Sequence, residues 1–178
     1  MNPFQQLFII LFIQLVSSNC VIEYDQVSNC VYTSSPLECS GDITIPSHCH
    51  CVKEKGFQKS KISTITFLST DPVEVNKYAF DTSDLTKFVS TKISIIGEYA
   101  FQKCYFLSEI SNIKTVTSIG QYAFLKCFLL TKFEFSDDLH DVGNYAFAGA
   151  ALKKAKLSKL TTGGYEWHTN TSRLHLFW

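Results

Sequence analysis

Apolar residues recur along the chain in short sets that follow the pattern apolar-x-x-apolar-x-apolar. The clearest sets begin at Leu85, Leu107, Leu130 and Leu152, and an earlier one consists of Ile62, Ile65 and Phe67. The second half of this pattern predicts a short strand, because successive side chains of a strand point to opposite faces. Each set is therefore expected to place alternate side chains in a core and to present the residues between them outward.

Between these sets the tripeptide Tyr-Ala-Phe occurs four times, at Tyr78, Tyr99, Tyr122 and Tyr145, and a glycine stands two residues before the last three. A strand plus a return segment of about 23 residues cannot bury its apolar edge alone, so successive copies must stack on one another. The sequence therefore predicts a leucine-rich-repeat right-handed solenoid. It should consist mainly of short parallel β-strands, with turns and short helical returns.

The residue types within the repeat indicate their places in a coil. Phe is expected to fill the interior, Tyr to lie half inside with its hydroxyl at the edge, and Gly to stand where a Cβ would clash. A stacking platform for a cofactor or a base is the alternative, but aromatic spacing that follows the repeat favours core packing. Cys104 and Cys127 occupy the same position of adjacent copies, either as buried thiols or as a disulfide.

The segment Thr117 to Cys127, which reads TSIGQYAFLKC, is similar to the repeat of BspA-type leucine-rich-repeat proteins, which occur on the surfaces of bacteria and protozoan parasites. The resemblance covers roughly residues 55 to 160. It implies an adhesive or recognition role and supplies no catalytic motif and no cofactor, so we do not expect an enzyme.

The N-terminal residues differ from the rest. Leu7 to Val16 is an apolar run without charge that is too short to span a bilayer as a helix, which predicts a signal peptide over residues 1–18. We therefore expect a secreted or cell-surface protein with no transmembrane segment in the mature chain. Asn170 begins the one glycosylation sequon. The predicted domains are a Cys-rich cap over residues 19–54 and the solenoid over residues 55–178.

The cap contains five cysteines, which are Cys20, Cys30, Cys39, Cys49 and Cys51. Four of them are expected to form two disulfides, although spacing alone does not give the pairing. The alternative is a metal site in the run from His48 to Cys51. Strand alternation opposes it, because the two histidines would face one side and the two cysteines the other.

The charges leave few partner classes. Sixteen Lys and Arg balance sixteen Asp and Glu, so no overall field favours binding to nucleic acid. The outward strand positions offer a local ligand-binding face on a concave sheet, at Thr64, Thr66, Lys87, Glu109, Lys132, Glu134, Lys154 and Lys156. The basic end of this row suits an acidic protein patch or a sulfated glycan. Alternatively, the lysines only keep the sheet soluble and block edge pairing.

Together these features predict an extracellular protein-interaction or adhesion module that binds a protein or glycan on a host or neighbouring cell. The alternative is a structural coat component that self-associates through its apolar tail, Leu174 to Trp178.

Overall fold

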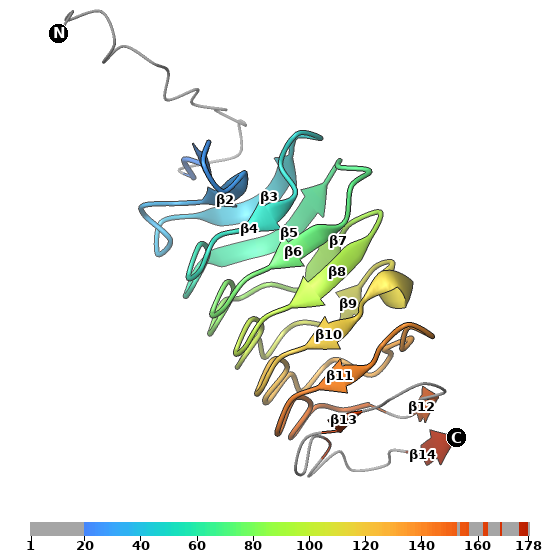
Figure 1. The fold of residues 1–178 in the computed structure, drawn as a ribbon. Helices are drawn as coiled ribbons and strands as arrows, with labels where there is room; N and C mark the ends of the chain where they lie inside the picture. The colour runs from blue at the N-terminus through green and yellow to red at the C-terminus, as the bar shows by residue number, and fades with distance from the viewer. Residues whose placement is uncertain (1–19, 153, 157–161, 164–167, 169–174, 178) are drawn as a thin grey trace, which may run out of the picture.

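The chain winds into a β-solenoid of about five turns in the computed structural model, which describes residues 20–152, 154–156, 162–163, 168 and 175–177. Its coils stack along one axis (Figure 1). The predicted signal peptide and Asn170 lie outside the described residues. Within them, no helix is long and apolar enough to cross a membrane.

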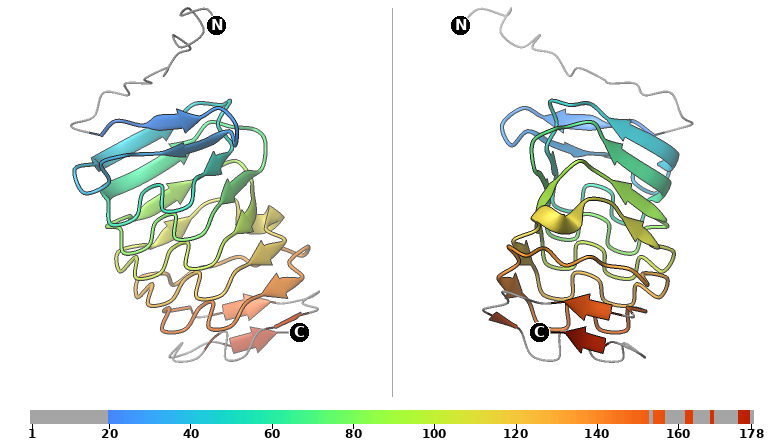
Figure 2. Two further views of the ribbon diagram at one scale, coloured as in Figure 1. Left: turned by 60° about the vertical axis from the view of Figure 1, so that its left-hand side comes forward. Right: turned by 90° about the vertical axis from the view of Figure 1, so that its right-hand side faces the viewer.

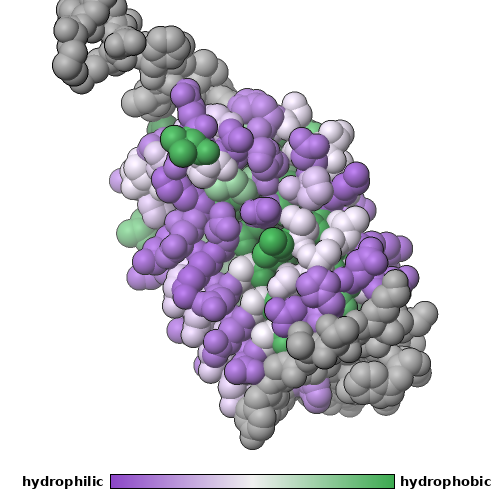
Figure 3. Space-filling model, viewed as in Figure 1, coloured by the Kyte–Doolittle hydropathy of each residue, from purple (hydrophilic) through white to green (hydrophobic). Residues whose placement is uncertain are grey.

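One side of the solenoid is an eight-stranded sheet in which all neighbours are parallel except β1 and β2. Its strands in spatial order are β1 (Glu23–Asp25), β2 (Cys30–Tyr32), β4 (Cys51–Val52), β6 (Val73–Val75), β8 (Ile93–Ile96), β10 (Ser118–Ile119), β11 (Asp141–Val142) and β13 (Thr162–Gly163). The face of the molecule that includes this sheet is largely hydrophilic, with isolated hydrophobic residues (Figure 3).

A second side carries a four-stranded parallel sheet and, further along the axis, a two-stranded parallel one (Figure 2, right). The four strands are β3 (Ser40–Ile45), β5 (Lys61–Phe67), β7 (Lys87–Val89) and β9 (Glu109–Ile110), and the two are β12 (Lys154–Lys156) and β14 (His175–Phe177). The prediction of short parallel strands is confirmed.

The expectation of short helical returns is wrong. Within residues 20–152 the one helical element is the 3-10 turn η2 (Ile113–Thr115), which lies outside the return segments. In a return, the N–H groups of Tyr99, Phe101 and Lys103 donate to carbonyls of the next coil at 2.7–2.9 Å. An α-helix needs these N–H groups for its own carbonyls four residues back, so stacking replaces the helix with consecutive turns.

Two aromatic ladders run along the axis. The Phe ladder lies in the core, where neighbouring ring centroids are 4.9–5.5 Å apart, and consists of Phe57, Phe80, Phe101, Phe124 and Phe147. The Tyr ladder is half-buried, with centroids 4.7–5.2 Å apart, and consists of Tyr78, Tyr99, Tyr122 and Tyr145. Both ladders lie where the repeat predicts them.

Strand pairing runs across the predicted boundary between cap and solenoid. β2 pairs with β4 and β3 pairs with β5, so residues before 55 already stack as coils. β1 folds back antiparallel on β2 at the end of the sheet. Lys53 donates to the carboxylate of Asp25 at 2.8 Å, which lowers the pKa of Asp25 to about 2 and ties the end of β1 to the next coil. The division at residue 54 stays a prediction.

Candidate ligand-binding face

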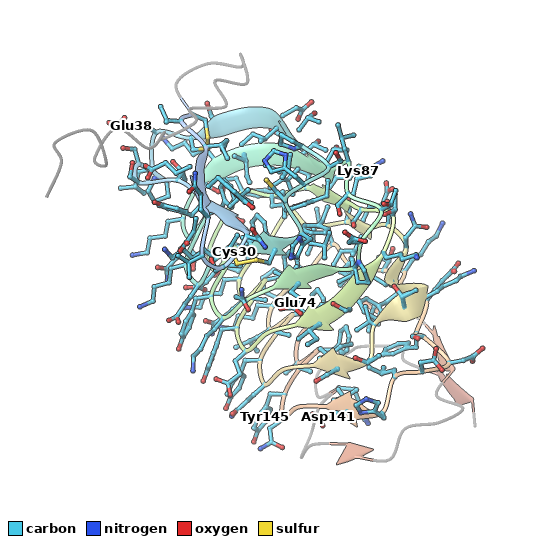
Figure 4. All side chains as sticks on the ribbon, turned by 45° about the horizontal axis from the view of Figure 1, so that its top comes forward. Cys30, Glu38, Glu74, Lys87, Asp141 and Tyr145 are labelled. Carbon is cyan, nitrogen blue, oxygen red and sulfur yellow. A yellow bond between two sulfur atoms is a disulfide. The ribbon has the colours of Figure 1, made fainter. Side chains whose placement is uncertain are left out.

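The outward side chains of the four-stranded sheet form two rows. Strand register places Asp42, Thr64, Lys87 and Glu109 side by side in one row, and Thr44, Thr66 and Val89 in the other. The residues between them, such as Ile65 and Phe88, are fully buried. Lys87 is labelled on this side of the solenoid in Figure 4, whereas Glu74 and Asp141 belong to the eight-stranded sheet. Alternation along the strands therefore fixes which residues point outward from this sheet.

Lys87 and Glu109 form an ion pair across β7 and β9. Their charged atoms are 2.9 Å apart, and the hydrogen bond from Lys87 lowers the pKa of Glu109. Both side chains are about half exposed, so water screens the pair and its contribution to stability is small. Its main effect is to fix the positions of two charges on this face.

The row breaks after β9. Lys132 and Glu134 lie in residues 131–135, which form no strand, although the repeat pattern predicts one there. Within the described coils, no backbone hydrogen bond joins residues 131–134 to β9. The coils are joined again by the Ser136 hydroxyl, which donates to the Lys114 carbonyl at 2.7 Å. One edge of β9 is therefore open.

A hollow of about 550 Å³ lies at this break. Its lining comes from two adjacent coils, with Ser108, Glu109, Ile110, Asn112, Ile113 and Lys114 on one side and Thr131, Lys132 and Glu134 on the other. Lys114 and Glu134 form an ion pair between the coils at 3.1 Å. Three of the eight predicted ligand-binding residues thus meet at one cavity.

Four of the predicted ligand-binding residues, Thr64, Thr66, Lys154 and Lys156, are not among the described residues that line this hollow. Thr64 and Thr66 are half-buried on β5, two coils before the hollow. Lys154 and Lys156 belong to β12, which pairs with β14, but their side chains lie outside the described part of the structure. Whether these residues contact a ligand stays a prediction.

The structure pairs four of the five cap cysteines. Cys20 bonds to Cys39 and Cys30 to Cys51, while Cys49 remains a buried thiol. Figure 4 shows a yellow disulfide bond at Cys30. Cys51 is thus unavailable as a thiolate ligand, and the described residues contain no group of three potential metal ligands. The alternative of a metal site from His48 to Cys51 finds no support.

Cys104 and Cys127 are buried thiols without a disulfide between them. Each Sγ donates to the carbonyl of the preceding coil's phenylalanine, Cys104 to Phe80 at 3.0 Å and Cys127 to Phe101 at 3.1 Å. Burial raises the pKa of Cys104 to about 12 and that of Cys127 well above its usual range. Both thiols stay neutral at physiological pH, so neither serves as a nucleophile.

These assignments predict the pattern of thiol alkylation. Folded protein treated with iodoacetamide at about pH 8 is expected to gain no label, because burial keeps the three thiols neutral and inaccessible. Denaturation without reductant should give three labels, and denaturation with reductant should give seven in total. Intact mass spectrometry counts them. Five labels after denaturation alone would show that one bridge is missing.

Sequence reasoning missed four exposed apolar side chains, Tyr105, Phe106, Phe128 and Leu129. They lie where the chain leaves the return segments of the second and third Tyr-Ala-Phe copies. The signal was present, since these two copies have one more residue between Phe and the next buried Leu than the first and fourth copies have.

Comparison with known proteins agrees with this architecture. The family model for a BspA type leucine rich repeat region matches residues 25–153 with six copies. A leucine rich cell surface protein from Faecalibacterium prausnitzii is 17% identical with a TM-score of 0.54, over 90% of this chain and 53% of that one. A leucine-rich repeat protein from Eubacterium ventriosum is 18% identical with a TM-score of 0.46, over 77% and 51%.

The chain thus spans about half the length of these two solved structures. At 17% identity, the likeness to the Faecalibacterium prausnitzii protein bears on the fold alone. No curated protein sequence matches the chain significantly. Because the family model covers most of the sequence, the chain belongs to the BspA-type leucine-rich-repeat proteins.

Proposed function

We propose that this protein is an extracellular recognition module that binds a protein ligand on the face made by β5, β7, β9 and residues 131–135. The observation that carries the proposal is the hollow beside the open edge of β9. Open strand edges offer backbone donors and acceptors to an incoming chain, and solenoids commonly bind partners on such a repeated face.

The charges of this face favour an acidic ligand. Glu109 and Glu134 are already paired, with Lys87 and Lys114 respectively. Lys132 is exposed, and within the described residues no carboxylate lies within ion-pair distance of it. Lys154 and Lys156 follow at equivalent repeat positions. An acidic protein patch, or a sulfated glycan, would meet uncompensated positive charge here.

An extracellular location is supported by the cysteines. Two disulfides close the first coils, and such bonds persist in oxidising compartments. The predicted signal peptide over residues 1–18 is consistent with the same location. Binding rather than catalysis fits the family, whose repeats form interaction surfaces.

Charge reversal at Lys132, Lys154 and Lys156 tests the face. We expect the triple Glu variant to bind cells or immobilised heparin at least tenfold more weakly than the wild type, since each lysine near an anionic surface adds roughly 1 kcal/mol or less. The matched control is Lys92→Glu, an exposed lysine in the turn between β7 and β8. Equal binding by the triple variant and the control would exclude this face.

Self-association as a coat component is the alternative, acting through residues 174–178. It requires the molecular mass to rise with protein concentration. Light scattering of the full secreted chain separates the two functions, because a recognition module should stay monomeric while still binding cells.

A further inference from the structure

The exposed apolar residues Tyr105, Phe106, Phe128 and Leu129, here named the aromatic corner, form a second surface on the turns that precede β9 and residues 131–135. Tyr105 is 40% exposed and the other three are each 51% exposed. The rings of Tyr105 and Phe128 stack, with centroids 5.4 Å apart. Two adjacent coils therefore present aromatic side chains together at one place on the surface.

The fold does not require the aromatic corner. In the first and fourth copies the corresponding segments are Ser83-Asp84-Leu85 and Ala150-Ala151-Leu152, which are one residue shorter. Leu85 and Leu152 are nevertheless as fully buried as Leu107 and Leu130. The extra residue thus adds nothing to the core and only creates a turn with two outward apolar side chains. Clustered exposed apolar residues that packing does not explain indicate a binding site.

The stack of rings ends at a hollow. A cavity of about 430 Å³ lies beyond Phe128 and is lined by Leu125, Lys126, Phe128, Ala148, Gly149, Ala150 and Ala151. In the repeat, Ala151 stands where Phe128 stands one coil earlier. Alanine is too small to continue the Tyr105–Phe128 stack, so the space of the next ring is open. An aromatic ring placed there would stack on Phe128 and contact the alanine side chains.

Charge decides what occupies this space. Lys103 and Lys126 each lie two residues before an exposed pair of the aromatic corner, and Lys126 itself lines the hollow. Within the described residues, neither lysine lies within ion-pair distance of a carboxylate. A second copy of this chain, packed corner to corner, would bring these lysines against each other. A partner carrying acidic residues would instead neutralise them.

We infer that the aromatic corner binds an extended segment of a partner protein that carries an aromatic side chain flanked by acidic residues. The ring enters the hollow and stacks on Phe128, so that the Tyr105–Phe128 stack gains a third ring. The flanking carboxylates pair with Lys103 and Lys126. The hollow at the aromatic corner shares no lining residue with the hollow beside β9, so loss of one surface need not affect binding to the other.

Titration of the full, isotope-labelled secreted chain with the blocked peptide Gly-Asp-Phe-Asp-Gly tests the inference by NMR. We expect amide shifts confined to residues 103–106, 125–129 and 148–151, with a Kd of about 1 mM for so short a probe. Replacing Phe by Ala in the peptide, or both Asp by Lys, should weaken binding at least tenfold. No shift at about 10 mM peptide would overturn the inference.

Two substitutions in the protein test the same site, one by removing an aromatic ring and the other by adding one. Phe128→Ser removes the ring on which the ligand stacks, and Ala151→Phe fills the hollow with a ring of the chain itself. Both should lose peptide binding at least tenfold. The control Val27→Ser removes an apolar side chain that is 96% exposed elsewhere, and it should bind as the wild type does.

Unchanged peptide binding by both variants would refute the proposed site on the aromatic corner. So would a lysine-flanked peptide that binds as tightly as the Asp-flanked one. So would a concentration-dependent dimer of the wild type that Phe128→Ser converts to a monomer, because a second copy would then be the occupant.

Discussion

Replacing Gly143 by alanine is expected to lower the free energy of unfolding by about 3 kcal/mol, the upper end for an overpacked site. A Cβ at this position would lie 2.4 Å from the backbone nitrogen of Gln121 and 2.7 Å from its Cα. These are backbone atoms of the preceding coil, so no side-chain rotation relieves the clash. The coils must separate, which strains the hydrogen bond from the Gly143 N–H to the Ile119 carbonyl, now 2.8 Å. Urea denaturation followed by circular dichroism measures the loss.

Two controls separate close approach from backbone conformation. Gly149 has a positive φ of 72°, but a Cβ there would meet nothing closer than 3.7 Å. Gly149→Ala should therefore cost only the strain of a left-handed residue, about 1 kcal/mol. Gln121→Ala, on the half-exposed surface of the preceding coil, should change stability by no more than about 0.5 kcal/mol. A loss in Gly143→Ala no larger than that in Gly149→Ala would show that the coils can part at little cost.

The stacking of coils could be predicted because the last three Tyr-Ala-Phe copies repeat the same close contact between backbones. Gly120 and Gly143 precede Tyr by two residues wherever a Cβ would enter the neighbouring backbone, and Phe124 returns to the core in register. The conformation of the return segments could not be predicted correctly. Segments such as Gln121 to Lys126 contain good helix formers, so local propensity favours a helix that the structure does not have. Hydrogen bonds to the next coil are non-local, and they hold Tyr122 at a φ of 55°. Tertiary contacts override local propensity here.

The sequence contains a signal for one of the two disulfide pairings. Cys30 and Cys51 are 21 residues apart, the same separation as Tyr78 and Tyr99. One coil therefore brings these two cysteines into register on β2 and β4. The 19-residue separation of Cys20 and Cys39 carries no such signal, because β1 folds back antiparallel and leaves the repeat.

The candidate face could be predicted in part. Alternation within a strand identifies Thr64, Lys87 and Glu109 as outward positions, since it depends only on local geometry. The hollow depends on how two coils diverge, and residues 131–135 keep the apolar pattern of a strand while leaving the sheet. No property of one copy reveals whether its neighbour stays paired, so this cavity emerges only from the fold.

Phe124→Ala is expected to cost about 4 kcal/mol, within the range for truncating a fully buried aromatic residue. Its ring centroid lies 5.2 Å from Phe101, 4.9 Å from Phe147 and 5.4 Å from Phe133. Truncation leaves a cavity between three coils that rigid backbone stacking cannot collapse. The matched control is Tyr122→Ala in the same copy, which removes a half-buried ring of the Tyr ladder and should cost about 1–2 kcal/mol.

Phe124→Ala is also expected to change how the protein unfolds. Each coil of a solenoid contacts only its neighbours, so a weakened interface divides the molecule into two parts of unequal stability. Hydrogen exchange should lose protection first in residues 117–152, while the disulfide-closed coils before Phe101 keep theirs. A uniform loss of protection along the chain would mean that the coils unfold as one unit, because the effect of the cavity would then extend beyond the neighbouring coils.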